Sequence, residues 1–159
     1  KRGSDGEIDD SVDDGKDEEY YEQARRNVER LSDEYDIEML NIPDTPEVDS
    51  LDAQVVSLYI KDEHPEKWER FDSEVFEALW KEGRDIGDVD VLVELAEEVG
   101  VDSEEVRDAL EEEELRSRLF EMFTEATEDG VHGVPTFVYG EHSCRGAVPP
   151  EQLRRLIEG

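Results

Sequence analysis

The chain has 159 residues, of which 35% are hydrophobic, enough for one compact domain or for a domain with an insertion. Seventeen basic residues against 48 acidic ones give a formal charge of −31. This charge argues against nucleic acid or an anionic membrane as a partner, because no basic stripe is present to replace counterions. No run of about 18 apolar residues occurs, so we expect no segment that spans a membrane.

The acidic residues are spread along the whole chain, and apolar residues recur among them at helical spacing. This pattern favours a folded protein over a disordered acidic one. Arginine outnumbers lysine twelve to five. Dispersed carboxylates with few lysines are typical of a protein that stays soluble in molar salt, where screening over about 3 Å limits self-repulsion. We therefore expect a cytoplasmic protein of an extreme halophile.

The first residues of the sequence are typical of connecting chain. Residues 1–16 are mostly Gly, Ser, Asp and Lys, and the sequence starts at Lys1 without a signal-like segment. We expect a loop or linker over residues 1–19 that follows an N-terminal β-α-β unit of a longer protein.

Apolar residues three and four positions apart then predict a series of amphipathic helices. The first helix runs from Asp17 to about Tyr35, a break with two prolines covers residues 41–50, and a second helix covers residues 51–63. A third helix runs from Pro65, a residue favoured in the first turn, through Lys81. Its predicted apolar face comprises Trp68, Phe71, Val75, Phe76, Leu79 and Trp80.

Three further helices are predicted by capping signals and by spacing. One ends at Gly100, which fits a C-terminal cap. The next begins where Asp102 and Glu105 have the spacing of a capping box, and the last ends near Glu128. We expect the apolar faces of these helices to form a core rather than a cofactor site.

After Gly130 the pattern changes from helical to extended. The runs TFVYG and SCRGA, separated by GEH, predict a hairpin, and EQLRRLIEG predicts a short terminal helix whose inward residues are Leu153, Leu156 and Ile157. The segment GVHGVPTFVYG at residues 130–140 contains no charge, so we expect its strand to be buried. A two-stranded hairpin is marginal alone, so another part of the protein or another chain is expected to complete the sheet.

Cysteine and histidine give few signals of chemistry. Cys144 is the only cysteine, which excludes a disulfide within the chain and a cysteine-based zinc site. In a strand it is expected to be a small buried hydrophobe. His64, His132 and His142 lie far apart and form no HExxH pattern, so no metal site is expected.

Three stretches carry a resemblance to a known family: GVHGVPTFV (130–138), RGAVPPEQLRRLIE (145–158) and EALWKEGRDIGDVDVLVELAEEVGVD (77–102). Over residues 20–158 the chain resembles the DsbA-like thioredoxin-fold proteins, in the branch of FrnE-like oxidoreductases and 2-hydroxychromene-2-carboxylate isomerases. The resemblance implies an α/β, thioredoxin-like fold with a large all-α insertion. Residues 20–129 would form the insertion, and residues 130–159 would form the closing β-β-α half.

The resemblance also implies a thiol–disulfide oxidoreductase without a cofactor, whose partners are protein or small-molecule thiols and disulfides. Its Cys-x-x-Cys pair would precede Lys1, so no catalytic residue is expected within the 159 residues. Val134, Pro135 and Thr136 would bind substrate, with Pro135 in a cis peptide bond that turns the backbone of Val134 toward an extended substrate. His132 would be a neighbour of the cleft, although a histidine between two glycines is more often only solvated.

Two alternatives remain open at this stage. The first is a glutathione-dependent isomerase of the 2-hydroxychromene-2-carboxylate type. Against the pattern Asn-Thr-x-x-Ala-His of many relatives, the chain keeps Ala53 but has Asp49 and Gln54. The second is a non-catalytic helical interaction module. Oligomeric state, natural substrate and redox direction are not readable from the sequence.

Overall fold

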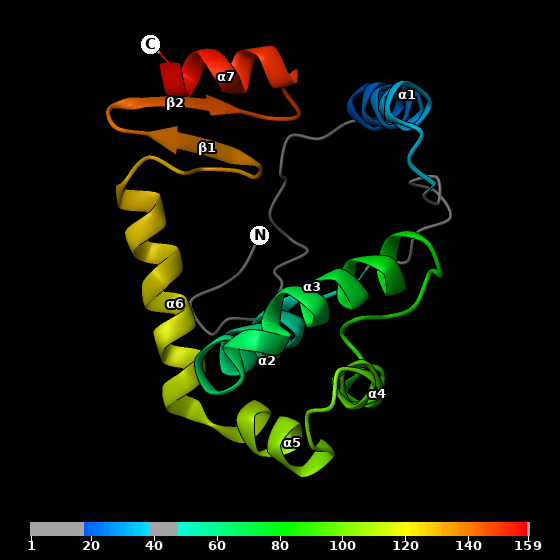
Figure 1. Ribbon diagram of the computed structural model, residues 1–159, viewed down its shortest axis with the longest axis vertical. Helices are drawn as coiled ribbons and strands as arrows, with labels where there is room; N and C mark the ends of the chain where they lie inside the picture. The colour runs from blue at the N-terminus through cyan, green and yellow to red at the C-terminus, as the bar shows by residue number, and fades with distance from the viewer. Residues whose placement is uncertain (1–17, 39–47, 159) are drawn as a thin grey trace. The chain divides into compact units, whose positions relative to one another are not determined.

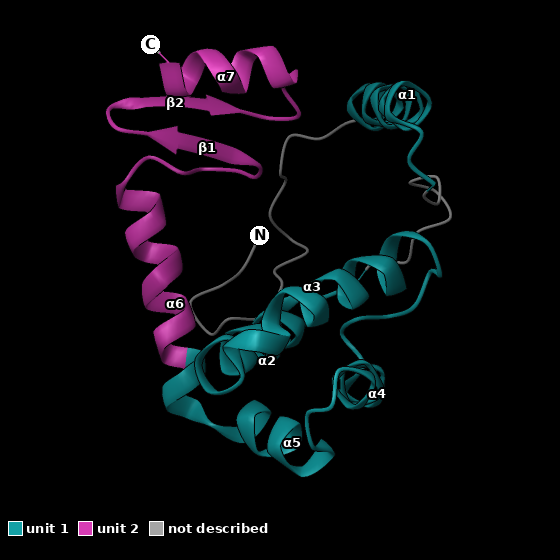
Figure 2. Cartoon of the chain, viewed as in Figure 1, with its two compact units in different colours: residues 1–116 teal, residues 117–159 magenta. Residues whose placement is uncertain are grey.

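A computed structural model of the chain describes residues 18–38 and 48–158 (Figure 1). Residues 1–17 of the loop expected over 1–19, and most of the break expected at 41–50, lie outside these ranges. Glu18 and Glu19, the last two residues of the expected loop, are helical. The chain has two compact units, residues 1–116 and residues 117–159, which divide within one helix (Figure 2). Each unit is described by itself below.

The helices of the first unit and the shared helix confirm the helices predicted from apolar spacing. The first, α1, has no buried residue, whereas the next four contact one another. Their bounds are α1 Glu18–Tyr35, α2 Leu51–Glu63, α3 Pro65–Trp80, α4 Val89–Glu98, α5 Ser103–Glu111 and α6 Glu113–Glu128.

Local capping signals set where several of these helices begin and end. Pro65 occupies the first turn of α3, where its missing N–H costs nothing. At the end of α4, Gly100 has φ +81°, and the next amide, of Val101, donates to the carbonyl of Ala96 at 2.9 Å. This is the left-handed termination that glycine favours, so the predicted cap at Gly100 is confirmed.

The core of the first unit lies among α2, α3, α4 and α5. Phe71 of α3 is fully buried in it, and Ala78, seven residues later, is 1% exposed. Phe76 was predicted on the same face but is 64% exposed. Five residues rotate a helix by about 140° relative to Phe71, so Phe76 lies on the side that the bundle leaves uncovered. The largest fully buried side chains are Phe71, Ile60, Leu92, Val55, Val56 and Val106.

The capping box predicted at the start of α5 forms only in part. Asp102 caps the helix by accepting the amide N–H of Glu104 at 2.8 Å. Glu105 makes long-range contacts with its carboxylate instead: its Oε2 accepts the hydroxyl of Tyr59 at 2.8 Å and lies 2.7 Å from Nε2 of His64. This carboxylate therefore ties α5 to α2 and to the junction between α2 and α3.

These contacts change the protonation of the groups involved. The hydrogen bond with His64, followed by that with Tyr59, lowers the pKa of Glu105 below its ordinary value of 4.5. Burial, followed by the hydrogen bond to Glu105, raises the pKa of Tyr59 to about 12. The ionised carboxylate and the neutral phenol are therefore the forms that the folded helices favour.

A second polar cluster joins α2 to α3. The indole N–H of Trp68 donates to the hydroxyl oxygen of Ser57 at 3.0 Å, and that hydroxyl donates to Asp72 at 2.6 Å. A buried indole needs such a partner for its N–H. Trp68 thus contributes apolar area to the bundle without leaving its polar atom unsatisfied.

The loop between α3 and α4 approaches the start of α2 closely. A Cβ placed on Gly87 would lie 2.8 Å from the carbonyl oxygen of Asp49. Glycine is required there because any side chain would force the two segments apart.

The second unit contains the end of α6, a hairpin and a terminal helix. Strands β1 (Thr136–Tyr139) and β2 (His142–Arg145) pair antiparallel, with Phe137 opposite Cys144. Gly140, with φ +59°, supplies the positive φ that the turn needs. Helix α7 (Pro150–Glu158) contacts both strands (Figure 1). The predicted hairpin and terminal helix are confirmed.

Two predictions about burial in this unit are wrong. The strand in residues 130–140 was expected to be buried, but Val138 and Tyr139 are 59% and 54% exposed. Ile157 was expected to face inward and is also exposed, while Leu153 and Leu156 are half-buried. Within residues 117–158 one short helix packs on the hairpin, so much of its apolar surface has no neighbour to cover it.

Within residues 18–38 and 48–158, no helix combines the length and the apolar character needed to cross a bilayer.

The buried position of Phe71 predicts a large effect on stability. Phe71→Ala removes a fully buried ring and should lower the free energy of unfolding by about 3–5 kcal/mol. The control Phe76→Ala, on the same helix but exposed, should change it by less than about 0.5 kcal/mol. Urea denaturation followed by circular dichroism measures both, and equal effects would contradict the placement of the core.

The lowered pKa of Glu105 predicts a pH-dependent contribution to stability. Because its folded pKa lies below its unfolded value of 4.5, Glu105 should stabilise the fold above that pH and lose this effect as pH falls through the folded pKa. Urea midpoints of wild type and Glu105→Gln should differ at pH 7 and converge toward pH 3. A difference that stays constant over this range would show that the charge of Glu105 is not involved.

Candidate functional site

The substrate-binding residues predicted from the sequence lie in the segment between α6 and β1 and at the first residue of β1. Gly130, with φ +84°, ends α6, and the amide of Val131 donates to the carbonyl of Ala126 at 2.9 Å. The residues that follow, 131–135, run as a loop to the first residue of β1. Val134, Pro135 and Thr136 are therefore adjacent at the point where the loop enters the strand.

The predicted residues differ in how far they are exposed. Val134 is 91% exposed, and the Val134–Pro135 peptide bond is cis, the geometry that the resemblance implies. Thr136 is half-buried, and its hydroxyl donates to the carbonyl of Gly133. His132 is exposed, which fits a solvated side chain. The loop thus presents Val134 to solvent and holds Thr136 against its own backbone.

The hairpin determines which backbone groups of β1 remain unpaired. The amide of Gly146 donates to the carbonyl of Pro135 at 2.8 Å, and Phe137 and Tyr139 lie opposite Cys144 and His142. Because ladder bonds alternate along an antiparallel strand, Phe137 and Tyr139 direct their N–H and C=O groups toward β2. Thr136 and Val138 direct theirs toward the other side, and Val134 precedes them in the loop. We call this row the open edge of β1.

No other strand lies along this edge within the described residues, because the sheet there has the order β1-β2. An unpaired strand edge is a template on which another extended segment can form hydrogen bonds. The exposed side chains of Val134 and Val138 add apolar contact surface to it. The open edge can therefore bind extended polypeptide through the backbone.

The charge of this part of the chain also differs from the rest. Residues 130–159 contain three arginines and three glutamates, so their formal charge is zero, and residues 1–129 carry the whole −31. An acidic coat keeps solvent-facing surface soluble, whereas surface covered by other polypeptide is depleted of charge. The neutral composition and the exposed apolar strand make residues 130–159 a candidate surface for contact with other polypeptide.

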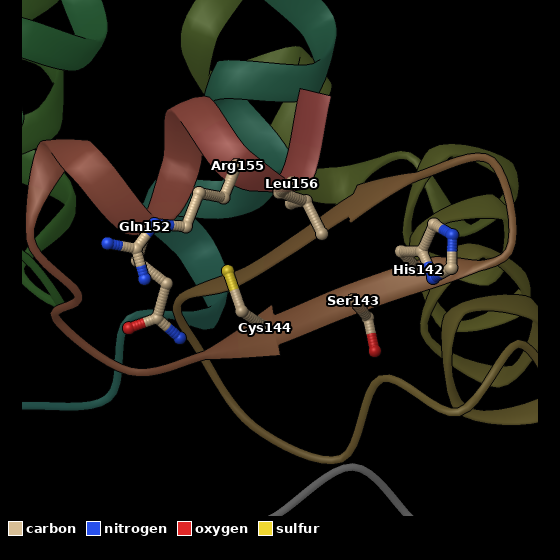
Figure 3. A pocket seen from close by; sticks show the side chains of 6 residues that line it. All are labelled: His142, Ser143, Cys144, Gln152, Arg155 and Leu156. Atoms are coloured by element: carbon tan, nitrogen blue, oxygen red, sulfur yellow. The ribbon is translucent and has the colours of Figure 1, made fainter. Parts of the chain in front are cut away.

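Cys144 belongs to β2, the strand on the other side of β1 from its open edge. It was expected to be buried, but it is half-buried and free. Figure 3 shows its sulfur pointing toward the helix that carries Arg155 and Leu156. It lines a shallow pocket of about 290 Å³ between β2 and α7. The thiol is therefore packed against α7 and does not face Val134.

The residues that bear on the isomerase alternative shape the start of α2. Asp49 Oδ1 accepts the amide N–H of Leu51 at 2.9 Å. The side-chain amide of Gln54 donates to the hydroxyl of Ser50 at 3.2 Å. Both of the residues that differ from the isomerase pattern thus take part in local hydrogen bonds at a helix N-terminus.

Sequence reasoning missed two residues of this region. Val138 was read only as part of a buried strand, and the register of the hairpin is needed to place it on the open edge. Arg145 was not singled out, although its guanidinium Nη2 donates to the carbonyl of Gly130 at 2.7 Å. The one signal for Arg145 was that it is one of three cations in residues 130–159.

A helical region followed by a β-β-α unit, with a proline directly before the first strand, defines an α/β protein of the thioredoxin-like class. Comparison with known proteins gives the family. The DSBA-like thioredoxin domain family matches residues 7–158, and the chain belongs to that family.

Two relatives illustrate the similarity. The chain is 33% identical over 92 residues to the uncharacterized protein YwbO of Bacillus subtilis (strain 168), a match that covers 57% of this chain and 46% of that protein. The chain therefore spans about half the length of this curated relative. Its fold is similar to the crystal structure of a Nitrosomonas europaea protein provisionally named a protein disulfide isomerase. The TM-score is 0.71 at 18% identity, over 89% of this chain and 73% of that one.

Proposed function

We propose that this chain supplies the substrate-binding part of a thiol–disulfide oxidoreductase of the DSBA-like class. The observation that carries the proposal is the open edge of β1, where Thr136 and Val138 direct their backbone groups away from β2. Val134, at the head of this edge, is 91% exposed. An extended substrate segment binds there as an added strand, with the hydrogen bonds made by backbone groups of both chains.

The open edge suits substrates that share a thiol or disulfide but differ in amino-acid sequence. Backbone hydrogen bonds are independent of side chains, so many extended segments bind in the same way. Pro135 has no N–H, so it offers no donor to a sulfur bound beside the loop. Protein thiols and disulfides in extended segments are therefore the proposed substrate class.

The chemical step needs groups that this sequence does not contain. Disulfide exchange requires a thiolate that attacks and a second thiol that resolves the mixed disulfide. Cys144 is the only cysteine, and it faces α7 rather than the open edge. We assign no step to Cys144 and propose that the cysteine pair belongs to polypeptide outside these 159 residues.

The finer assignments rest on sequence patterns. The segment Gly-Val-x-Gly-Val-Pro at residues 130–135 supports the FrnE-like branch of the family. The dispersed acidic residues, with a formal charge of −31 and few lysines, support the cytoplasm of a halophile. We propose both, with protein or small-molecule thiols and disulfides as partners and no cofactor.

Val138→Pro tests the role of the open edge directly. The substitution removes one outward N–H, whereas the ladder bonds of Phe137 and Tyr139 to β2 stay in place, and proline is tolerated on an edge strand. The affinity for a blocked, extended peptide of about ten residues with a central S-methylcysteine should fall roughly tenfold. Titration of the 159-residue chain, followed by its amide chemical shifts, measures the dissociation constants.

Two variants control this experiment. Val138→Thr keeps the N–H and a β-branched side chain and should bind as the wild type does. Cys144→Ser should also bind normally, because no step is assigned to this thiol. Unchanged affinity of Val138→Pro, with its hairpin amides still protected, would contradict the proposed edge.

A further inference from the structure

The end of α6 lacks a cation of its own. The last turn of this helix has no basic residue, and Glu125, Glu128 and Asp129 all lie at or next to it. The carbonyl groups at a helix C-terminus carry partial negative charge, so acidic neighbours are unfavourable and a cation is favourable. The helix therefore needs a positive group from elsewhere in the fold.

Arg145 supplies that group from β2. Its guanidinium Nη2 donates to the carbonyl of Gly130 at 2.7 Å, across fifteen residues of sequence. Gly130 is the residue with φ +84° that ends α6 and begins the loop. A hydrogen bond from a charged donor is shorter and stronger than one between neutral groups, so this contact fixes the start of the loop.

The end of the same loop is fixed by the next residue of the chain. The amide of Gly146 donates to the carbonyl of Pro135 at 2.8 Å. Arg145 itself lies opposite Thr136 in the hairpin register. Residues 145 and 146 therefore hold both ends of the loop, and Val134 lies between these two attachment points.

We infer that Arg145 is the positioning residue of the substrate-binding loop. It acts through Gly130: the hydrogen bond orders residues 131–134 before a substrate arrives. A loop that is already ordered does not lose that conformational freedom on binding, which strengthens affinity. This inference rests on the proposed function of the open edge and extends it to a residue outside the Val134–Thr136 segment.

Arginine suits this task better than lysine. The guanidinium is planar and pre-organised, and it remains charged at every pH at which the protein folds. Lysine keeps the charge but presents it on a more flexible stem. Lysine at position 145 should therefore restore part of the ordering and not all of it.

The experiment uses the 159-residue chain and the S-methylcysteine peptide described above. Arg145→Ala should weaken peptide binding by roughly threefold to tenfold. It should also speed amide hydrogen exchange at Gly130 and Val131, whose amides donate to the carbonyls of Thr127 and Ala126, while the amides of Phe137 and Tyr139 stay protected. Arg145→Lys should recover part of both effects. Arg154→Ala, which removes an equal charge from α7, should change neither.

The outcomes separate this inference from the proposed function. If wild type does not bind the peptide, the proposed edge fails, and exchange of the loop amides alone decides the role of Arg145. Normal affinity or unchanged loop exchange in Arg145→Ala would overturn the inference, as would an equal effect of Arg154→Ala. If Arg145→Ala loses hairpin protection, Arg145→Gln, which keeps a side-chain N–H donor and loses the charge, is judged by the same two measurements.

Discussion

A hairpin of two four-residue strands cannot pair both of its edges or cover both of its faces. In this chain α7 covers one face, and the outer edge of β1 stays unpaired within the described residues. Isolated two-stranded sheets are marginal in water, so the exposed Val138 and Tyr139 are surfaces on which another polypeptide can pack or pair. The proposed function follows from the unpaired backbone groups on this edge of β1. Val134, in the loop before the strand, lies next to them in the sequence.

The two units differ in how they bury their apolar side chains. The helices α2 to α5 enclose a core of their own around Phe71, and long-range polar contacts such as Glu105 with His64 and Tyr59 hold them together. Residues 1–129 carry the whole net charge of −31, whereas residues 130–159 are neutral overall. A surface with little charge and much exposed apolar area is the kind that binds other polypeptide. The distribution of charge thus distinguishes residues 130–159, where we propose that substrate binds, from the strongly acidic rest of the chain.

Much of the fold was predictable because its signals are local. Gly100 and Asp102 mark helix ends by backbone conformation and capping, and both act within a few residues. The exposure of Phe76 was not predictable, because a broad apolar face does not say which side its neighbours cover. The contacts of Glu105 and Arg145 join residues 46 and 15 positions apart, and only the packed chain brings those atoms together. The residues proposed to bind substrate could be named from the sequence because they are consecutive, whereas Arg145, proposed to position their loop, lies on another strand.

The central claim is that an extended substrate pairs with the open edge of β1, and hydrogen exchange of the chain with and without the S-methylcysteine peptide tests it most directly. The account predicts an alternating result: the amides of Val134, Thr136 and Val138 become protected when the peptide binds, and those of Phe137 and Tyr139 do not change. Protection confined to α2–α5, or equal protection along all of β1, would contradict it.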